Sequence, residues 1–184
     1  MTPRNMMLVG LFTAMIAIGS QIAVPIGPVP ITLHVVAVML AGAVLGSRLA
    51  FGSVALWALL GTVGLPVFAQ GKAGAAVLIG PTGGYIFGFM LCAYLVGLAA
   101  ERLALGYGKM TGVMLAGLMV IYTLGLLGFM LSFQYVLQKP MTLEKALQLA
   151  VWPFLPLDVI KTIVAAYLGV RVRRALRQAG LIHV

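Results

Sequence analysis

The sequence predicts an all-α integral membrane protein, with a single membrane domain over residues 1–184 in which six transmembrane helices form a bundle. Three observations predict it. Hydrophobic residues make up 62% of the chain and charged residues only 8%, whereas a soluble domain carries about 25% charged residues to cover its surface. The apolar residues gather in six long segments, and most basic residues lie at the ends of those segments. Membrane lipid is therefore expected to cover most of the protein.

Each apolar segment approaches the length of about 20 residues that a helix needs to cross roughly 30 Å of hydrocarbon. The breaks between segments follow from residues that interrupt helices. Three prolines fall within residues 25–30, and Pro66 is followed by five glycines within residues 71–84; proline removes a backbone donor and glycine favours irregular backbone. We expect spans at about residues 6–24, 31–46, 49–65, 81–100, 110–137 and 153–170.

The distribution of lysine and arginine predicts the orientation of these spans, because basic residues concentrate at the cytoplasmic ends. With the N-terminus inside, eight basic residues fall on the inner face and three on the outer face, while Lys161 lies within the last span. We therefore expect both termini in the cytoplasm. The inner residues are Arg4, Arg48, Arg102, Lys109, Arg171, Arg173, Arg174 and Arg177, and the outer ones are Lys72, Lys139 and Lys145.

Asp158 and Lys161 are the most informative residues, because a charge at the centre of a span costs at least about 2.5 to 3.5 kcal/mol. Their spacing of three places both side chains on one face of a helix, where they can pair or jointly grip a ligand. Counting about 1.5 Å per residue back from Arg171 puts Asp158 in the outer half of the bilayer. Two interpretations stay open: a ligand site reached from outside, and an ion pair that only fixes the last helix to its neighbours.

Residues 65–88 form a second candidate site, since they combine many glycines with one charged residue. Glycine backbone can approach a ligand closely and offer its N–H groups. Aromatic residues flank the segment and could stack on an apolar ring, although aromatics at helix ends often serve as interfacial anchors. A compact turn between two spans is the alternative. The candidate ligand contacts in this segment are Phe68, Gln70, Lys72, Thr82 and Tyr85.

The proline-rich connection of residues 24–34 predicts a stiff, extended loop that could close over a site on the outer face. A tight reversal between two spans is the alternative. His34, at the end of this loop, is a further candidate ligand contact. It has no second ligand at metal spacing, so the sequence predicts no metal site.

The sequence argues against several classes of function. It contains no GxxxxGK[ST] phosphate loop, so the chain is not expected to hydrolyse ATP. The basic residues are scattered rather than clustered with stacking aromatics, which argues against nucleic acid as a partner. We find no nucleophile and base pair. An intramembrane enzyme using Asp158 as a base and Lys161 as an electrostatic stabiliser is the alternative from another class.

Several motifs in order along the chain resemble those of the BioY family, the biotin-specific substrate-binding components of energy-coupling factor (ECF) transporters. The resemblance covers nearly the whole chain, and the pairing of GLPVF with GPTGGY at this spacing is its most specific part. The motifs are GPVPITL at 27–33, LAGAVLG at 40–46, GLPVF at 64–68, GPTGGY at 80–85 and LDxxK at 157–161.

The resemblance implies a six-helix bundle, an S component of the ECF type, that binds biotin near the outer face with Asp158, Lys161 and Lys72. Gly10 and Ala14 take the place of the small residues through which the family's first helix docks on a transmembrane coupling subunit. Two ATPase subunits would use ATP, and no cofactor is expected in this chain. The resemblance also implies a bacterial or archaeal cytoplasmic membrane. A homo-oligomer, and another small carboxylated vitamin as the substrate, stay open as alternatives.

Overall fold

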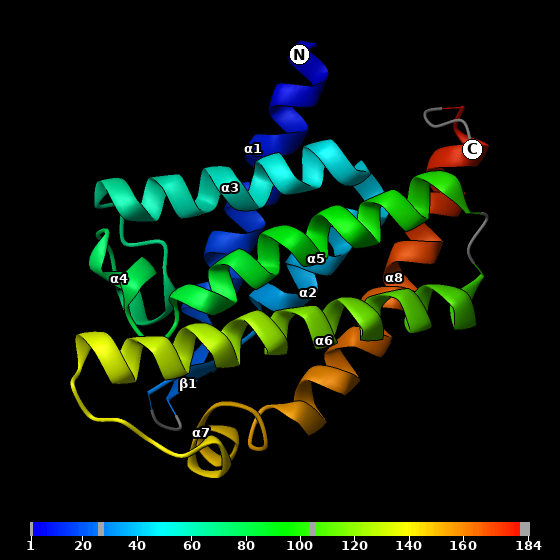
Figure 1. Cartoon of the computed structure of the whole chain (residues 1–184). Coiled ribbons are helices and arrows are strands. Elements are labelled where there is room, and N and C mark those ends of the chain that lie inside the picture. The colour runs from blue at the N-terminus through cyan, green and yellow to red at the C-terminus, as the bar shows by residue number, and fades with distance from the viewer. Residues whose placement is uncertain (1, 26–27, 104–105, 181–184) are drawn as a thin grey trace.

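The computed structural model describes residues 2–25, 28–103 and 106–180, and these are mostly helical (Figure 1). Six of the helices are long, and they overlap the six expected spans. The elements in chain order are α1 Pro3–Gln21, β1 Ala23–Pro25, β2 Pro30–Thr32, α2 His34–Leu45, α3 Ser47–Val63, η1 Ala69–Gly71, α4 Ala76–Ile79, α5 Gly83–Arg102, α6 Tyr107–Leu131, η2 Ser132–Val136, α7 Leu143–Ala150 and α8 Leu155–Gln178.

Local sequence sets several of the helix ends. The Thr2 hydroxyl accepts a hydrogen bond from a first-turn amide of α1, and Thr142 does the same for α7, which satisfies a backbone donor that has no partner within the helix. Gly64 ends α3 at a φ of +116° and donates its N–H to Gly61, a backbone conformation that glycine adopts without strain.

The limits of the predicted spans differ by one to eight residues from those of the helices, and three of the differences have a local cause. The first helix ends at Gln21 because Ala23–Pro25 pairs with Pro30–Thr32 as a short antiparallel hairpin. The fifth helix changes to a π-helix at Ser132. The last helix continues to Gln178 rather than ending near residue 170, because arginines that end the apolar pattern do not end the hydrogen-bonded helix.

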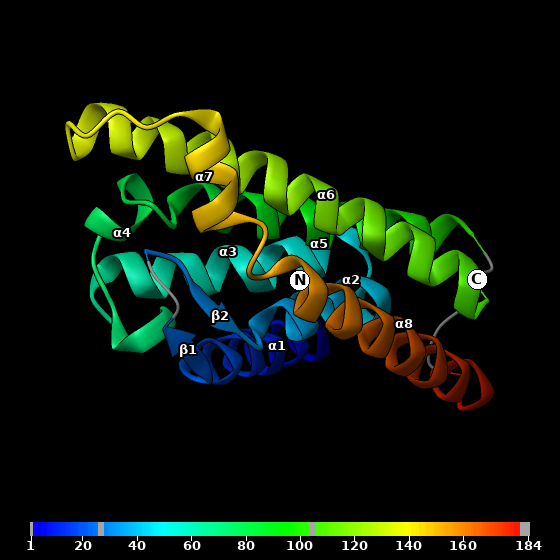
Figure 2. The ribbon, with the colours of Figure 1, turned by 90° about the horizontal axis from the view of Figure 1, so that it is seen from below.

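The bundle is layered, with α1 and α6 on opposite sides and α2, α3 and α5 between them (Figure 2). α5 packs closely along α6. A Cβ added at Gly128 would lie 2.5 Å from the Cα of Gly84, so the two helices meet through backbone here. Small residues allow this approach where side chains would hold helices apart.

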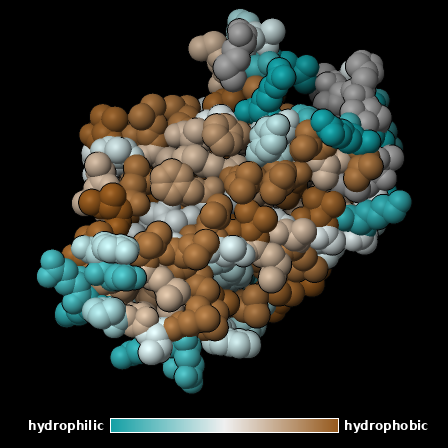
Figure 3. Space-filling model, viewed as in Figure 1, coloured by the Kyte–Doolittle hydropathy of each residue, from teal (hydrophilic) through white to brown (hydrophobic). Residues whose placement is uncertain are grey.

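The distribution of hydrophobic residues on the surface is that expected of a membrane protein. Figure 3 shows a broad hydrophobic band with hydrophilic residues towards its ends. By length and composition, Gly83–Arg102 and Tyr107–Val136 can each cross a bilayer, and the pair α7 and α8, bent by 51°, can form a third span; α2 and α3 are shorter apolar helices. The protein is a multi-pass membrane protein. The count of six spans and the side that the termini face stay predictions.

Candidate ligand-binding site

A cavity with about 730 Å³ of empty space, part of it open to solvent, lies between strand β2, the loop of residues 66–72 and helices α2, α3, α4, α5, α6 and α8. Its walls are mostly aromatic and aliphatic, with a few polar groups, as in small-molecule pockets of this size. The lining residues are Val29, Pro30, Ile31, Thr32, His34, Val35, Trp57, Phe68, Ala69, Lys72, Val77, Thr82, Tyr85, Ile86, Phe89, Ile121, Phe154 and Asp158.

Asp158 is the acidic group of this cavity. It lies in the first turn of α8, where the partial positive charge of the helix N-terminus favours a carboxylate. It is 9% exposed. Its Oδ1 lies 2.8 Å from the Lys161 Nζ, and its Oδ2 accepts a 2.8 Å hydrogen bond from the Tyr122 hydroxyl. A carboxylate has about four lone-pair positions, so Asp158 can still accept hydrogen bonds from a ligand.

Lys161 connects α8 to the hairpin and does not line the cavity. Its ammonium group donates to the Asp158 carboxylate and, at 2.8 Å, to the backbone carbonyl of Thr32 in β2. The structure therefore contains the ion pair and also places its acidic member at the cavity wall. The two interpretations left open by the sequence are compatible, since the pair fixes α8 and leaves Asp158 facing the cavity.

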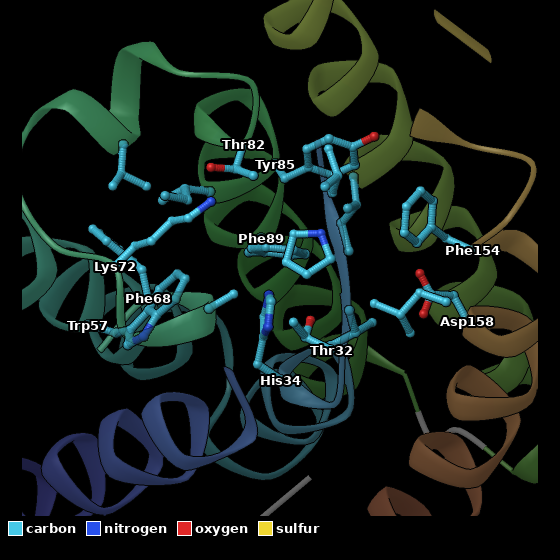
Figure 4. Close-up of a pocket in the computed structure, with 18 residues that line it drawn as sticks. Thr32, His34, Trp57, Phe68, Lys72, Thr82, Tyr85, Phe89, Phe154 and Asp158 are labelled. Atoms are coloured by element: carbon cyan, nitrogen blue, oxygen red, sulfur yellow. The ribbon is translucent and has the colours of Figure 1, made fainter. Parts of the chain in front are cut away.

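Lys72 lines the opposite side of the cavity from Asp158 (Figure 4). The loop that carries it is held by α1 and α3 through backbone carbonyls. Gln21 donates to Phe68 at 3.1 Å and accepts from the Gly71 amide at 3.1 Å, and the Trp57 indole donates to Val67 at 2.9 Å. These bonds position the base of the Lys72 side chain, and no salt bridge involves it among the described residues.

His34 begins α2 at the cavity wall and is 6% exposed. Its ring packs against Phe89 and Trp57 at centroid distances of 4.5 and 5.5 Å. Neither ring nitrogen has a hydrogen-bond partner in the described part of the chain. A buried polar atom without a partner is costly, so a ligand that bonds to His34 would remove this cost.

Tyr85, Thr82 and Phe68 also line the cavity, as the sequence predicts for ligand contacts. The Tyr85 hydroxyl donates to the Ala150 carbonyl at the end of α7, so its hydrogen is already used within the protein. Phe68 is 2% exposed and packs edge-on against Trp57. The aromatic rings therefore form a fixed apolar wall.

Three sequence candidates lie away from the cavity. Gln70 is exposed in η1 with a φ of +62° and is not among the residues that line the cavity; its contact with a ligand stays a prediction. Gly10 and Ala14 are exposed on α1, and a Cβ added at Gly10 would meet nothing within 4 Å. Their face of α1 is free to meet a partner.

The sequence interpretation missed several residues of the site. Tyr122 binds Asp158, while Trp57, Phe89 and Phe154 complete the apolar walls. Tyr122 could have been found from the sequence, because a tyrosine in the middle of an apolar span has a buried hydroxyl that needs a partner. Nothing in the pattern distinguishes the other three from ordinary core residues.

These features define a class: a helical membrane protein that encloses a small-molecule site between its helices, with an acidic and a basic group on opposite walls. Comparison with known proteins then identifies the family. Residues 1–178 match the model of the BioY family, and the chain belongs to this family.

Named relatives cover nearly the full length. The biotin transporter BioY of Thermotoga maritima is 45% identical over 172 residues, which are 93% of this chain and 96% of the relative. The probable biotin transporter BioY of Pyrococcus horikoshii is 40% identical, over 94% and 98% of the two chains. The crystal structure of the S-component for biotin from an ECF-type ABC transporter superposes with a TM-score of 0.82 at 30% identity and covers 95% of each chain.

Proposed function

We propose that this protein takes up biotin, as the membrane subunit that captures it at the outer face and releases it towards the cytoplasm. The observation that carries this proposal is the cavity with Asp158 and Lys72 on opposite walls, in a member of a family whose named relatives are biotin transporters. Biotin is polar at both ends and apolar between them, and the cavity has the same distribution of groups.

Asp158 and His34 suit the ureido ring of biotin. The ring has two N–H donors and a carbonyl acceptor. Asp158 can accept an N–H, and a neutral imidazole offers one donor and one acceptor. Lys161 and Tyr122, each hydrogen-bonded to Asp158, hold the carboxylate in place for this purpose. Both carboxylate oxygens of Asp158 thus already have a partner in the protein, which favours a binding role over the intramembrane-enzyme alternative.

Lys72 suits the carboxylate at the other end of biotin. Lys161 already has Asp158 as a counter-ion, so Lys72 is the lining cation whose charge is left for the ligand. The aromatic walls between, including Tyr85 and Phe68, suit the thioether ring and the aliphatic chain. Lys161 acts as a positioning residue in this arrangement.

Release requires partners. The chain has no phosphate loop, so a transmembrane coupling subunit and two ATPase subunits are proposed to supply ATP hydrolysis, and the exposed small residues Gly10 and Ala14 give a close docking surface on α1. We propose a cytoplasmic-membrane location with the N-terminus inside. No cofactor is proposed for this chain.

Calorimetry on the purified, detergent-solubilised protein tests the proposal. Biotin is expected to bind, whereas lipoic acid, which has a sulfur ring and a carboxylate but no ureido group, binds far more weakly. Asp158→Ala is expected to weaken biotin binding by about 1 to 3 kcal/mol, the scale of a buried charge-assisted hydrogen bond. The matched control is Glu144→Ala, an exposed acid on α7. Equal affinity for both compounds, or unchanged binding by Asp158→Ala, contradicts the proposal.

A further inference from the structure

A second group of charged side chains lies where α6 begins and α8 ends. Tyr107 and Tyr167 stack with ring centroids 5.3 Å apart and planes 21° apart. Arg171 lies over Tyr167 at 5.2 Å, and Arg174 lies over Tyr107 at 4.7 Å. Arg174 also donates to the Tyr107 hydroxyl at 3.4 Å. In this tyrosine–arginine cluster, each ring of the stacked pair carries one guanidinium group.

No acidic side chain neutralises the cluster. The chain has three acidic residues. Glu101 accepts hydrogen bonds from Ser47, Glu144 lies on α7, and Asp158 pairs with Lys161. Over residues 2–25, 28–103 and 106–180, the Asp158–Lys161 pair is the only salt bridge. Both arginines of the cluster are exposed, so two positive charges face the surroundings uncompensated.

The cluster continues as an exposed stripe along α8. Ile160, Val164, Tyr167, Arg171 and Arg174 follow each other at spacings of four, three, four and three, which places them on one face of the helix. Ile160 is 58% exposed, Val164 46% and Tyr167 48%. The stripe thus changes from aliphatic to aromatic to cationic along the helix.

The length of the stripe matches half a bilayer. Fourteen residues separate its ends, and at 1.5 Å per residue the rise is about 21 Å. Half of a bilayer of about 40 to 45 Å, headgroups included, is about 20 to 22 Å. The stripe therefore offers aliphatic contact at the depth of an acyl chain and positive charge at the depth of its phosphate.

We propose that this face of α6 and α8 binds an anionic phospholipid, with its headgroup at Arg171 and Arg174 and an acyl chain along Ile160 and Val164. Guanidinium groups bind phosphate oxygens in pairs of hydrogen bonds, and the two uncompensated charges select a net negative headgroup. The inference rests on the membrane location and is independent of biotin.

Lipid titration of the delipidated protein in detergent tests the proposal. Phosphatidylglycerol and phosphatidylcholine with the same acyl chains are added, and bound lipid is counted by native mass spectrometry alongside thermal unfolding. The wild-type protein is expected to prefer phosphatidylglycerol on the order of tenfold or more, given two basic residues at the headgroup. Arg171→Ala/Arg174→Ala is expected to lose that preference. The control variant Lys139→Ala/Lys145→Ala removes two positive charges near α7 and is expected to keep the preference for phosphatidylglycerol.

Two further experiments distinguish lipid binding from binding of free phosphate and from loss of folding. Inorganic phosphate at the same concentration is expected to leave the melting temperature unchanged, and equal protection by phosphate would overturn the lipid assignment. The variant Arg171→Lys/Arg174→Lys keeps both charges and serves as a control for folding. It is expected to retain part of the preference for phosphatidylglycerol. The proposal is wrong if wild-type protein binds both lipids equally, or if the double alanine variant keeps its lipid preference but loses co-purifying protein subunits.

Discussion

Lys72→Met tests which lysine meets the ligand carboxylate. The substitution keeps most of the length of the side chain and removes the ammonium group at the wall opposite Asp158. A hydrogen bond to a charged group contributes about 1.5 to 3 kcal/mol. Lys72 is exposed to solvent as well as to the cavity, so we expect the lower end, about 1.5 kcal/mol, which corresponds to roughly a tenfold loss of affinity.

The assay is a cycle in which both the protein and the ligand change. Calorimetry measures biotin and biotin methyl ester against wild-type protein and Lys72→Met. The wild type is expected to prefer the free acid, and the variant to bind both compounds alike, with the ester hardly affected by the substitution. Lys139→Met, an exposed lysine outside the cavity, serves as the control. Equal weakening of acid and ester would refute the reasoning, because Lys72 would then act on some other part of the ligand.

Three further predictions concern the groups around the cavity. Lys161→Met is expected to lower the free energy of unfolding by about 3 to 5 kcal/mol, since Asp158 stays buried without its counter-ion; Asp158→Asn/Lys161→Met should regain much of this in thermal unfolding while biotin binding stays weak. Tyr122→Phe removes a hydrogen bond to an ionised carboxylate and is expected to cost about 1.5 to 3 kcal/mol of stability in the same assay, with unchanged melting counting against the bond. Gly128→Val forces α5 and α6 apart at Gly84 and should destabilise by at least about 1 to 3 kcal/mol, whereas a normal melting temperature would show that the backbones do not meet there.

The helical segments could be predicted from sequence because each depends on local properties. A run of apolar residues long enough for the bilayer becomes a helix, since lipid offers no partner for backbone groups. Asp158 could be singled out for a related reason: a charge in such a run needs compensation. In the structure, Asp158 lies in α8 and lines the cavity.

The helix limits were less predictable. The hairpin that shortens the first helix depends on pairing between Ala23–Pro25 and Pro30–Thr32, and the apolar pattern does not encode that pairing. Gln70 shows the same problem within one loop. It lies two residues from Lys72 and has a positive φ, yet only Lys72 of the two lines the cavity.

By itself, the sequence determined a helical membrane protein with an acid and a base one turn apart in its last helix, because hydropathy and helical spacing are local. Only the tertiary structure decided how these groups are used. It brings the Thr32 carbonyl to Lys161 across 129 positions of the chain and the Tyr122 hydroxyl to Asp158 across 36, so the lysine is occupied and the carboxylate is fixed. Such partners come from packing between distant segments, and no local pattern specifies which segments will meet.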